Sequence, residues 1–294
     1  MPTDTQKRIG ILRGGAGRHY ESSLKKGGDI ISYIHENLAD KYKPLDILID
    51  KDHIWHFNGV PVNPGDLVHK VDLTWNLSHP SFSNIIESLS IPHIGPGNFS
   101  RSLMSDRNIF KEYIKNIGVH MPRHIVSPKN AQEVFEIFGA GWIVKSLTGG
   151  AAPDIRLAQT FGELAQAIED KANLGESIMV EEFIVGKSSV VHSVENFRDE
   201  AVYVLPPDNL STIDKEKIII ITKILHKHLN VKHYLKLDFT LNPKRGVFLT
   251  SVEFVPDLRI GSHLEKSCES VGAKMHHIVE HILESTLSMT HHQI

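Results

Sequence analysis

The 294 residues of the chain are enough for two or three lobes around a substantial core. Hydrophobic residues make up 40% and charged residues 23%, as in soluble globular proteins, and the net charge of −3 argues against nucleic acid as a partner. The single cysteine, Cys268, excludes an intramolecular disulfide, and no apolar run approaches the ~20 residues of a membrane span. Since the first strand follows no signal-peptide pattern, we expect a cytoplasmic protein without a membrane partner.

The first 95 residues alternate short strands with helices. Apolar strands are predicted at residues 8–14, 44–50 and 71–77, and a helical period runs from 23 to 38. This alternation predicts a parallel or mostly parallel sheet. The glycines of "RGGAG" (13–17) predict a tight turn after the first strand, where backbone N–H groups could also bind an anion.

A Gly/Pro-rich connection, "IPHIGPGN", leads into a second segment that mixes helices and strands. Its first helix begins near Ser105 and Asp106 and ends at Gly118. Further helices and strands are predicted at 129–138, 142–147, 160–173, 178–184, 188–194 and 200–206.

The last segment is predicted to contain a long helix at 212–229, a β-hairpin and a terminal helix from about Ser267. We therefore expect three domains: 1–95, 96–204 and 205–294.

The segment "WIVKSLTGGAAPD" (142–154) places a lysine before a glycine loop. Lys145 ends an apolar strand, and the small residues after it can surround a phosphate with their N–H groups. This pattern suits binding of a nucleotide phosphate. A lysine that lays its stem on apolar surface beside a hairpin loop is the alternative.

Two acids end another apolar strand in "IMVEEFIVGK" (178–187). Where such a strand passes into a loop, its backbone groups can bind an adenine edge, and a carboxylate can accept a hydrogen bond from the adenine amino group. An edge strand with solvated acids would show the same pattern.

A predicted hairpin carries two more acids. In "YLKLDFTL" (234–241) apolar residues alternate with Lys236, Asp238 and Thr240, so the acid lies on the polar face. The second strand, after the turn "NPKRG", carries Glu253, and an even-residue loop would place both acids on one face. Two carboxylates on rigid strands suit Mg²⁺ that is shared with nucleotide phosphates. A hairpin whose acids face solvent is the alternative.

In this order, the parts resemble the ATP-grasp superfamily and, within it, the D-alanine–D-alanine ligases, over essentially the whole chain. "GGAGRHYESSLKKGGDI", "WNLSHP" and "EFVPDLRIGSHLEKS" resemble further motifs of that family. The resemblance implies an α/β fold in which a Rossmann-like parallel-sheet domain (1–95) precedes two α+β lobes that clamp ATP. The first lobe (96–204) would include the central ATP-binding subdomain, and the second (205–294) the metal and substrate loop.

The resemblance also implies site residues, in four groups. The residues that would contact ATP are Arg107, Lys145, Gly149, Gly150, Ala151, Glu181, Glu182, Phe183, Ile184 and Ser188. Those that would bind Mg²⁺ are Asp238, Glu253 and Asp257. The catalytic group would be Lys236, beside the transferring phosphoryl group, together with His19 and Glu21. The substrate residues would be His79, Arg259, Gly261, Ser262 and His263.

The sequence departs from the family at several of these positions. On the nucleotide and metal side, Lys236 replaces an arginine, Val255 a metal-binding asparagine, Ala151 a serine and Ser188 a ribose-binding acid. Replacing arginine by lysine removes bidentate geometry. Asp257 is the residue that would substitute for the missing metal ligand.

On the substrate side, His19 stands where the family has the acid that anchors the first substrate's ammonium group, while Glu21 matches. Leu264 stands where a serine binds the acceptor's carboxylate. The lid, which carries a tyrosine and a lysine in the family, is reduced to "LPPDNLST".

The expected activity is an ATP- and Mg²⁺-dependent carboxylate–amine ligation through an acyl phosphate, with small amino-acid-like substrates and a possible homodimer as the assembly. Two alternatives stay open. The chain could be a non-catalytic ATP-binding paralogue with a degenerate substrate site, or a ligase for another amino acid pair.

Overall fold

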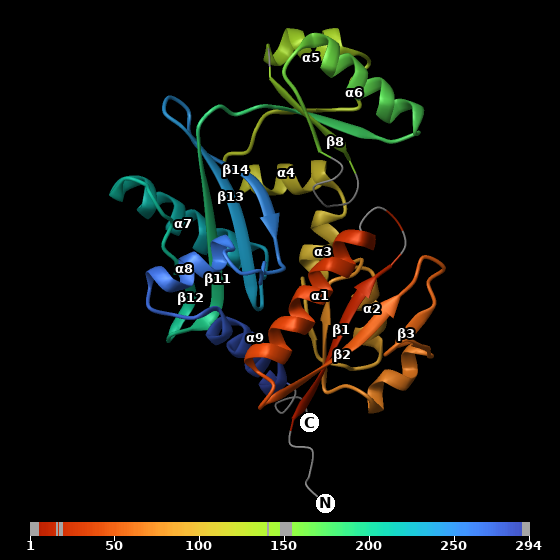
Figure 1. Cartoon of the computed structure of the whole chain (residues 1–294). Helices are drawn as coiled ribbons and strands as arrows, with labels where there is room; N and C mark the ends of the chain where they lie inside the picture. Colours follow the sequence, from red (N-terminus) through yellow and green to blue (C-terminus); the bar gives the residue numbers. More distant parts are fainter. Residues whose placement is uncertain (1–5, 16, 18–19, 140, 148–154, 290–294) are drawn as a thin grey trace, which may run out of the picture.

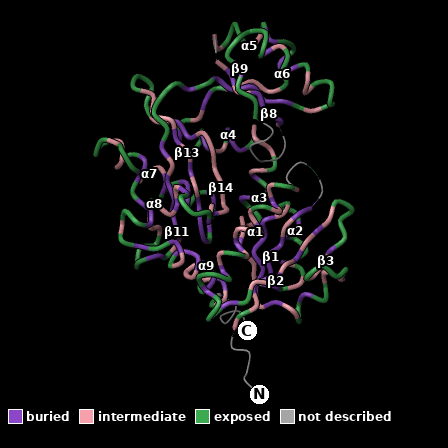
Figure 2. Tube along the Cα trace, viewed as in Figure 1, coloured by how far each residue is buried: buried purple, intermediate pink, exposed green. Residues whose placement is uncertain are grey.

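The computed structural model describes residues 6–15, 17, 20–139, 141–147 and 155–289. Three β-sheets with helices packed on them build this part of the chain (Figure 1). Buried residues follow the strands, while exposed residues line the outer helices and loops (Figure 2). In this part of the chain no helix is long and apolar enough to cross a membrane.

The first sheet has six strands in the order β4-β3-β2-β1-β5-β6. β1 pairs in parallel with β2 and β5, and β5 with β6, which confirms the predicted parallel sheet, while β3 and β4 add an antiparallel edge. The strands are β1 (Lys7–Gly14), β2 (Tyr42–Ile49), β3 (Trp55–Phe57), β4 (Val60–Pro61), β5 (Leu73–Asn76) and β6 (His93–Ile94).

Helices cover both faces of this sheet. The side chains of β1 alternate between the two faces, and apolar residues on each face pack against a helix. Ile9 and Ile11 pack in the same core as Ile30 of α1, whereas Leu12 packs with Leu67 and other residues of the opposite face. The helices are α1 (Tyr20–Asn37), the 3-10 helix η1 (Pro64–His69) and α2 (Phe82–Ser88).

The predicted glycine turn after β1 is present where the structure describes it. Gly14 has a φ of 87°, and a Cβ there would lie 2.2 Å from the carbonyl oxygen of Ile49, so only glycine fits. The N–H of Gly14 donates to Ser23 Oγ, which donates to the carbonyl of Leu77. This chain of bonds ties the ends of β1 and β5 to α1.

The second sheet is antiparallel, in the order β7-β10-β8-β9, and packs against α5 and α6. Two helices precede it, and the second begins as predicted, since the Asp106 side chain accepts from the N–H groups of Asn108 and Ile109. The elements are α3 (Asn98–Met104), α4 (Arg107–Asn116), β7 (His124–Val126), α5 (Ala131–Phe138), β8 (Trp142–Ser146), β9 (Arg156–Ala158), α6 (Phe161–Asn173) and β10 (Ile178–Glu182).

The third sheet is also antiparallel, in the order β12-β11-β13-β14. Leu235, Leu237 and Phe239 of β13 pack into a core with residues of α3, α4 and α7, which leaves Lys236 and Asp238 on the opposite face. The elements are β11 (Lys187–Phe197), β12 (Glu200–Leu205), α7 (Thr212–His228), β13 (Tyr234–Asn242) and β14 (Gly246–Glu253). The domain boundary at 204/205 stays a prediction; hydrogen bonds place strands from both sides of it in this sheet.

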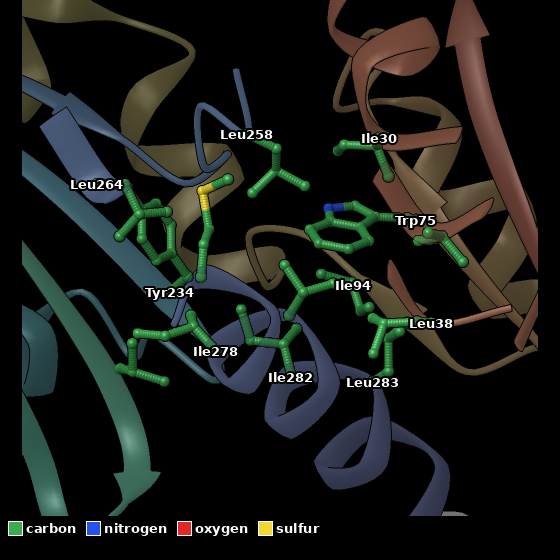
Figure 3. Packing of buried hydrophobic residues seen from close by; sticks show 14 of the residues in the cluster. Ile30, Leu38, Trp75, Ile94, Tyr234, Leu258, Leu264, Ile278, Ile282 and Leu283 are labelled. Carbon is green, nitrogen blue, oxygen red and sulfur yellow. The ribbon is translucent and has the colours of Figure 1, made fainter. Parts of the chain in front are cut away.

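The prediction of one terminal helix from about Ser267 is wrong. Two helices, α8 (His263–Ser270) and α9 (Met275–Met289), are separated at Gly272, whose φ of 66° ends the first one. α9 buries Ile278, Ile282 and Leu283 in a core that it shares with Trp75 of the first sheet (Figure 3). The C-terminal helix therefore joins the first and third sheets.

Candidate active site

A buried ion cluster lies where the sequence predicts phosphate and adenine binding. Lys145 Nζ of β8 is 2.6 Å from Glu181 Oε1 of β10, and Lys111 Nζ of α4 is 2.9 Å from the same oxygen. All three side chains are less than 10% exposed. Lys145 pairs with Met179 in the sheet register, so its side chain shares a face with that of Glu181.

The shared burial shifts the pKa of both partners. Burial would raise the pKa of Glu181, but the ammonium groups of Lys145 and Lys111 outweigh it and lower that pKa. Burial lowers the pKa of Lys145, and the positive charges of Lys111 and Arg107 add to this effect against the attraction of Glu181. Two ammonium groups thus share one carboxylate, and the charge of Arg107 also acts on Lys145, so the excess of positive charge favours binding of a further anion.

The predicted adenine frame follows directly on β10. The backbone N–H of Phe183 donates to the carbonyl of Gly141, the side chain of Phe183 is exposed, and that of Ile184 is buried. Ser188 is exposed near the start of β11, opposite Thr240 of β13. Phe183 and Ile184 thus follow Glu181 directly along the chain, whereas Ser188 belongs to the third sheet.

Glu182 points to different partners from those of its neighbour Glu181. Arg123 donates to Glu182 Oε2 over 3.0 Å through Nη2, and Arg245 from the β13–β14 turn donates to Glu182 Oε1 over 2.7 Å. Its carboxylate thereby joins the second sheet to the hairpin of the third. Burial would raise the pKa of Glu182, but hydrogen bonds from Arg245 and Arg123 lower it to about 2.

We expect Glu182→Gln to lower the free energy of unfolding by about 1–2 kcal/mol at pH 7. A pKa that falls from 4.5 to about 2 corresponds to roughly 3 kcal/mol at 1.36 kcal/mol per unit, reduced because both arginines are partly solvated. This stabilisation is complete above pH 4.5 and is lost as pH falls towards 2.

Urea titrations of wild type and Glu182→Gln between pH 3 and pH 7 measure this difference. The matched control is Glu112→Gln, which alters an exposed carboxylate 3.8 Å from Lys115 and should change stability by less than about 0.5 kcal/mol. A Glu182→Gln difference that does not shrink with falling pH would contradict the assignment.

Asp238 and Glu253 lie on one face of the hairpin, as predicted, but an irregularity in the strand pairing places them there and not the loop length. Asn242 pairs with Gly246 across a three-residue turn, Pro243 to Arg245, so the even-residue loop is absent. A β-bulge between Asp238 and Phe239 shifts the register, and Glu253 then pairs with Lys236. Without that bulge, the side chain of Glu253 would point to the opposite face.

Lys236 lies between the two acids. Its Nζ is 3.1 Å from Glu253 Oε1 and 3.6 Å from Asp238 Oδ2. The other oxygen of Glu253 is 3.5 Å from Lys26 Nζ of α1, so a helix that packs on the first sheet also reaches this face. Two carboxylates and two ammonium groups therefore alternate on the polar face of the hairpin.

The pKa shifts on this face differ between the two acids. Burial raises the pKa of Asp238, and the charge of Glu253 adds to that effect against the attraction of Lys236. Burial also acts on Glu253, but Lys236 and Lys26 outweigh it and lower its pKa. Attraction to the two acids likewise outweighs burial and raises the pKa of Lys236. Of these two acids, Asp238 is thus the one whose ionised form the fold disfavours.

Asp238 and Glu253 suit one Mg²⁺ ion whose remaining ligands are phosphates and water. They do not form a cage that would hold the ion by themselves, since no group of three metal-binding side chains occurs within the described residues. Val255 packs against the core shared by the first and third sheets. The carboxylate of Asp257 is bound by Arg259, with contacts of 2.8 and 2.5 Å. Metal binding by Asp257 therefore stays a prediction.

The predicted substrate loop leads into α8. Ser262 is the N-cap of this helix, where its hydroxyl accepts from the N–H of Glu265. His263 follows, and Lys236 and Asp238 lie within electrostatic reach of it. Gly261 has a φ of 77°, which lets the loop turn into the helix. The side chain of Arg259 is exposed and held by Asp257.

Two further predicted site residues, Glu21 of the catalytic group and His79 of the substrate group, come from segments that pack with the first sheet. Glu21 is exposed in the first turn of α1, and exposed His79 has its Nδ1 2.7 Å from Ser81 Oγ after β5. Four predicted site residues lie outside the described ranges: His19, Gly149, Gly150 and Ala151.

Known proteins of similar sequence cover almost the whole chain. The D-alanine–D-alanine ligase of Bacillus anthracis is 23% identical over 317 residues, which cover 95% of this chain and 97% of that protein. The D-alanine–D-alanine ligase of Azobacteroides pseudotrichonymphae is 20% identical over 326 residues, with 95% and 99% covered. No family model matches the chain.

Solved structures share the whole architecture. D-alanyl-alanine synthetase A from Vibrio cholerae has a TM-score of 0.79 at 16% identity and covers 97% of this chain, with 100% of its own length matched. The ATP complex of D-alanine–D-alanine ligase from Bacillus anthracis has a TM-score of 0.74 at 20% identity, with 96% and 98% covered. The chain has the ATP-grasp fold and is a divergent homologue of the D-alanine–D-alanine ligases.

Four residues make contacts at the candidate site that the sequence does not predict. Lys111 looks in the sequence like any other position of the helix α4. No neighbouring residue indicates that it contacts Glu181. Arg245 lies in a turn whose sequence predicts a turn and no partner for Glu182. Lys26 and His192 reach the site from α1 and β11, and only the tertiary fold shows this.

Proposed function

We propose that the chain is an ATP- and Mg²⁺-dependent ligase that joins a carboxylate to an amine. The observation that carries this proposal is the hairpin face, where Lys236 lies between Asp238 and Glu253. Ligation of this kind needs a cation-rich face for the phosphoryl group that moves from ATP to the carboxylate, and the acyl phosphate is then attacked by the amine. The named relatives and the ATP-bound structure support the same reaction.

Each group on the two faces has a role in this reaction. Lys145 and Arg107 balance the negative charge of the phosphates, and Glu181 keeps the Lys145 side chain extended in its buried position. Lys236 donates to the phosphoryl oxygens in the transition state, where negative charge spreads over them. Mg²⁺ held by Asp238 and Glu253 would neutralise phosphate charge as a Lewis acid.

The proposed substrates are small amino acids, and a pair of D-alanine molecules is the first pair to test because the homologues carry that name. A different pair is the second candidate. It is favoured by Leu264, which is fully buried and offers no hydrogen bond where the family has a serine. We place the reaction in the cytoplasm, and a homodimer is the proposed assembly.

An ADP-release assay tests the proposal. Purified protein with ATP and Mg²⁺ is given D-alanine, other D- and L-amino acids, and pairs of them, and the product is identified by mass spectrometry. We expect ADP and phosphate to form in a 1:1 ratio with a dipeptide-type product for at least one pair. ADP release without any coupled product, or no release from a folded protein that binds ATP, would contradict ligase activity.

A further inference from the structure

Three side chains, two of them buried, form a chain of hydrogen bonds beside the candidate site. Tyr234 Oη lies 2.7 Å from His192 Nδ1, and His192 Nε2 lies 2.9 Å from His263 Nδ1. The rings of Tyr234 and His192 stack, and both residues are only 2% exposed. The chain links β13 and β11 to the first residue of α8.

This chain lies on the sheet face that carries the two acids. His192 pairs with Lys236 in the register, and Tyr234 precedes Lys236 by two residues, so the three side chains share that face. His263 Nδ1 points into the chain. His263 Nε2 makes no hydrogen bond within the described part of the protein and is not among its fully buried polar atoms. One ring nitrogen of His263 is thus anchored while the other remains accessible.

Burial decides where the protons of this chain lie. His192 Nδ1 is the hydrogen-bond partner that the described residues provide for Tyr234 Oη, and a buried hydroxyl that cannot donate is costly. Tyr234 therefore donates to Nδ1, and His192 carries its own proton on Nε2 and donates it to His263 Nδ1. Burial, followed by nearby His263 and Lys236, lowers the pKa of His192 to about 3, so its ring is neutral.

His263 is then an acceptor at Nδ1. Ser267 Oγ, 3.2 Å away, is placed to donate to the same atom. Burial also lowers the pKa of His263, with Lys236 acting in that direction and the carboxylates of Asp208 and Asp238 against it. A neutral ring that accepts at Nδ1 must carry its proton on Nε2, the accessible nitrogen.

The residue after His263 explains why such a donor is needed. By resemblance, a serine there would bind the acceptor's carboxylate, but Leu264 is fully buried among core residues. An anionic group at this end of the site must therefore find another donor.

We propose that Tyr234 and His192 hold His263 as its Nε2–H tautomer, and that this N–H donates to the carboxylate of the acceptor amino acid. The inference rests on the proposed ligase function. Tyr234 and His192 are positioning residues, and His263 determines specificity. The opposite tautomer would present a lone pair to the carboxylate and repel it.

Long-range ¹H–¹⁵N spectra of histidine-labelled full-length protein test the tautomer without turnover. We expect His263 to carry its proton on Nε2 in wild type and to lose this preference in Tyr234→Phe, which removes the hydroxyl that sets the direction. His263→Gln identifies the His263 signals by their absence. A His263 ring protonated on Nδ1 in wild type would overturn the proposal.

Steady-state kinetics test the role in binding. For the amino acid pair that the ADP-release assay identifies, we expect Tyr234→Phe to raise the acceptor's KM about 3- to 10-fold and to leave the KM for ATP within about twofold. His263→Leu should raise the acceptor's KM further, and His263→Gln, which keeps an N–H donor, should restore part of the loss. Tyr203→Phe is the control, because its hydroxyl contacts Arg198 on the surface.

Different results would contradict the ligase activity and the role of His263 in acceptor binding. If wild type ligates no pair, the ligase proposal fails, while the spectra still decide the tautomer. If wild type turns over and both His263 variants keep the wild-type acceptor KM, this inference is wrong. If Tyr234→Phe does not fold, the His263→Leu and His263→Gln pair decides, because His263 is only partly buried.

Discussion

Lys145→Met should reduce kcat/KM for ATP by about 10²- to 10³-fold, as expected when a preorganised positive group is removed from a phosphoryl-transfer site. The methionine keeps an unbranched side chain, one atom shorter, but would leave the phosphates without the cation that β8 carries. Coupled-enzyme measurement of ADP release over a range of ATP concentrations gives the value.

Stability should change less than activity in this variant. Breaking a buried ion pair usually costs about 3–5 kcal/mol, but Glu181 keeps a second partner in Lys111, 2.9 Å away. We expect a smaller loss from urea unfolding, with a cooperative transition. Lys171→Met is the matched control, since Lys171 is a similarly buried lysine that pairs with Glu176 of the same sheet region. Comparable losses of activity in both variants would show that Lys145 acts through folding alone.

Local patterns were sufficient for much of the fold. Alternation of apolar residues located the strands that became β1, β2 and β5, and the cap at Asp106 located the start of α4. Residues that lie on one element, such as Lys236 and Asp238, were placed correctly on one face. In each of these cases the information sits within a few residues of the feature, so no tertiary structure is needed to read it.

The sequence did not reveal contacts that depend on distant segments or on local irregularity. Glu182 and Arg245 are 63 residues apart, and His192 and His263 are 71 apart. A bulge of one residue reversed the face of Glu253, and no pattern in β14 announces it. The helical pattern near the C-terminus predicts one terminal helix from about Ser267, whereas the structure has two helices, separated at Gly272. Neighbouring acids Glu181 and Glu182 look alike in the sequence and bind different partners.

Asp238→Asn should reduce ligation by about 10³-fold, since it removes the charge of a carboxylate proposed to hold Mg²⁺ at the transferring phosphoryl group. The protein should nevertheless remain as stable as wild type or become slightly more stable. The pKa of Asp238 is raised in the fold, so its ionised form is disfavoured there relative to the unfolded chain. At neutral pH the ionised carboxylate therefore costs stability, and this cost shrinks as pH falls through the folded pKa and is gone below the unfolded pKa.

Asp72→Asn is the control with the opposite signs. Arg8 binds the carboxylate of Asp72 through its guanidinium group at 2.8 Å and its backbone N–H at 2.6 Å, and the hydrogen bonds of Arg8 lower the pKa of Asp72 against the effect of burial. Its replacement should lower the free energy of unfolding by about 1 kcal/mol and leave ligation unchanged.

Asp238→Asn should also abolish the rise in melting temperature that Mg²⁺ adds to the ATP complex. An Asp238 variant that loses stability in parallel with activity, and still responds to Mg²⁺, would show that this carboxylate supports the hairpin and not the metal.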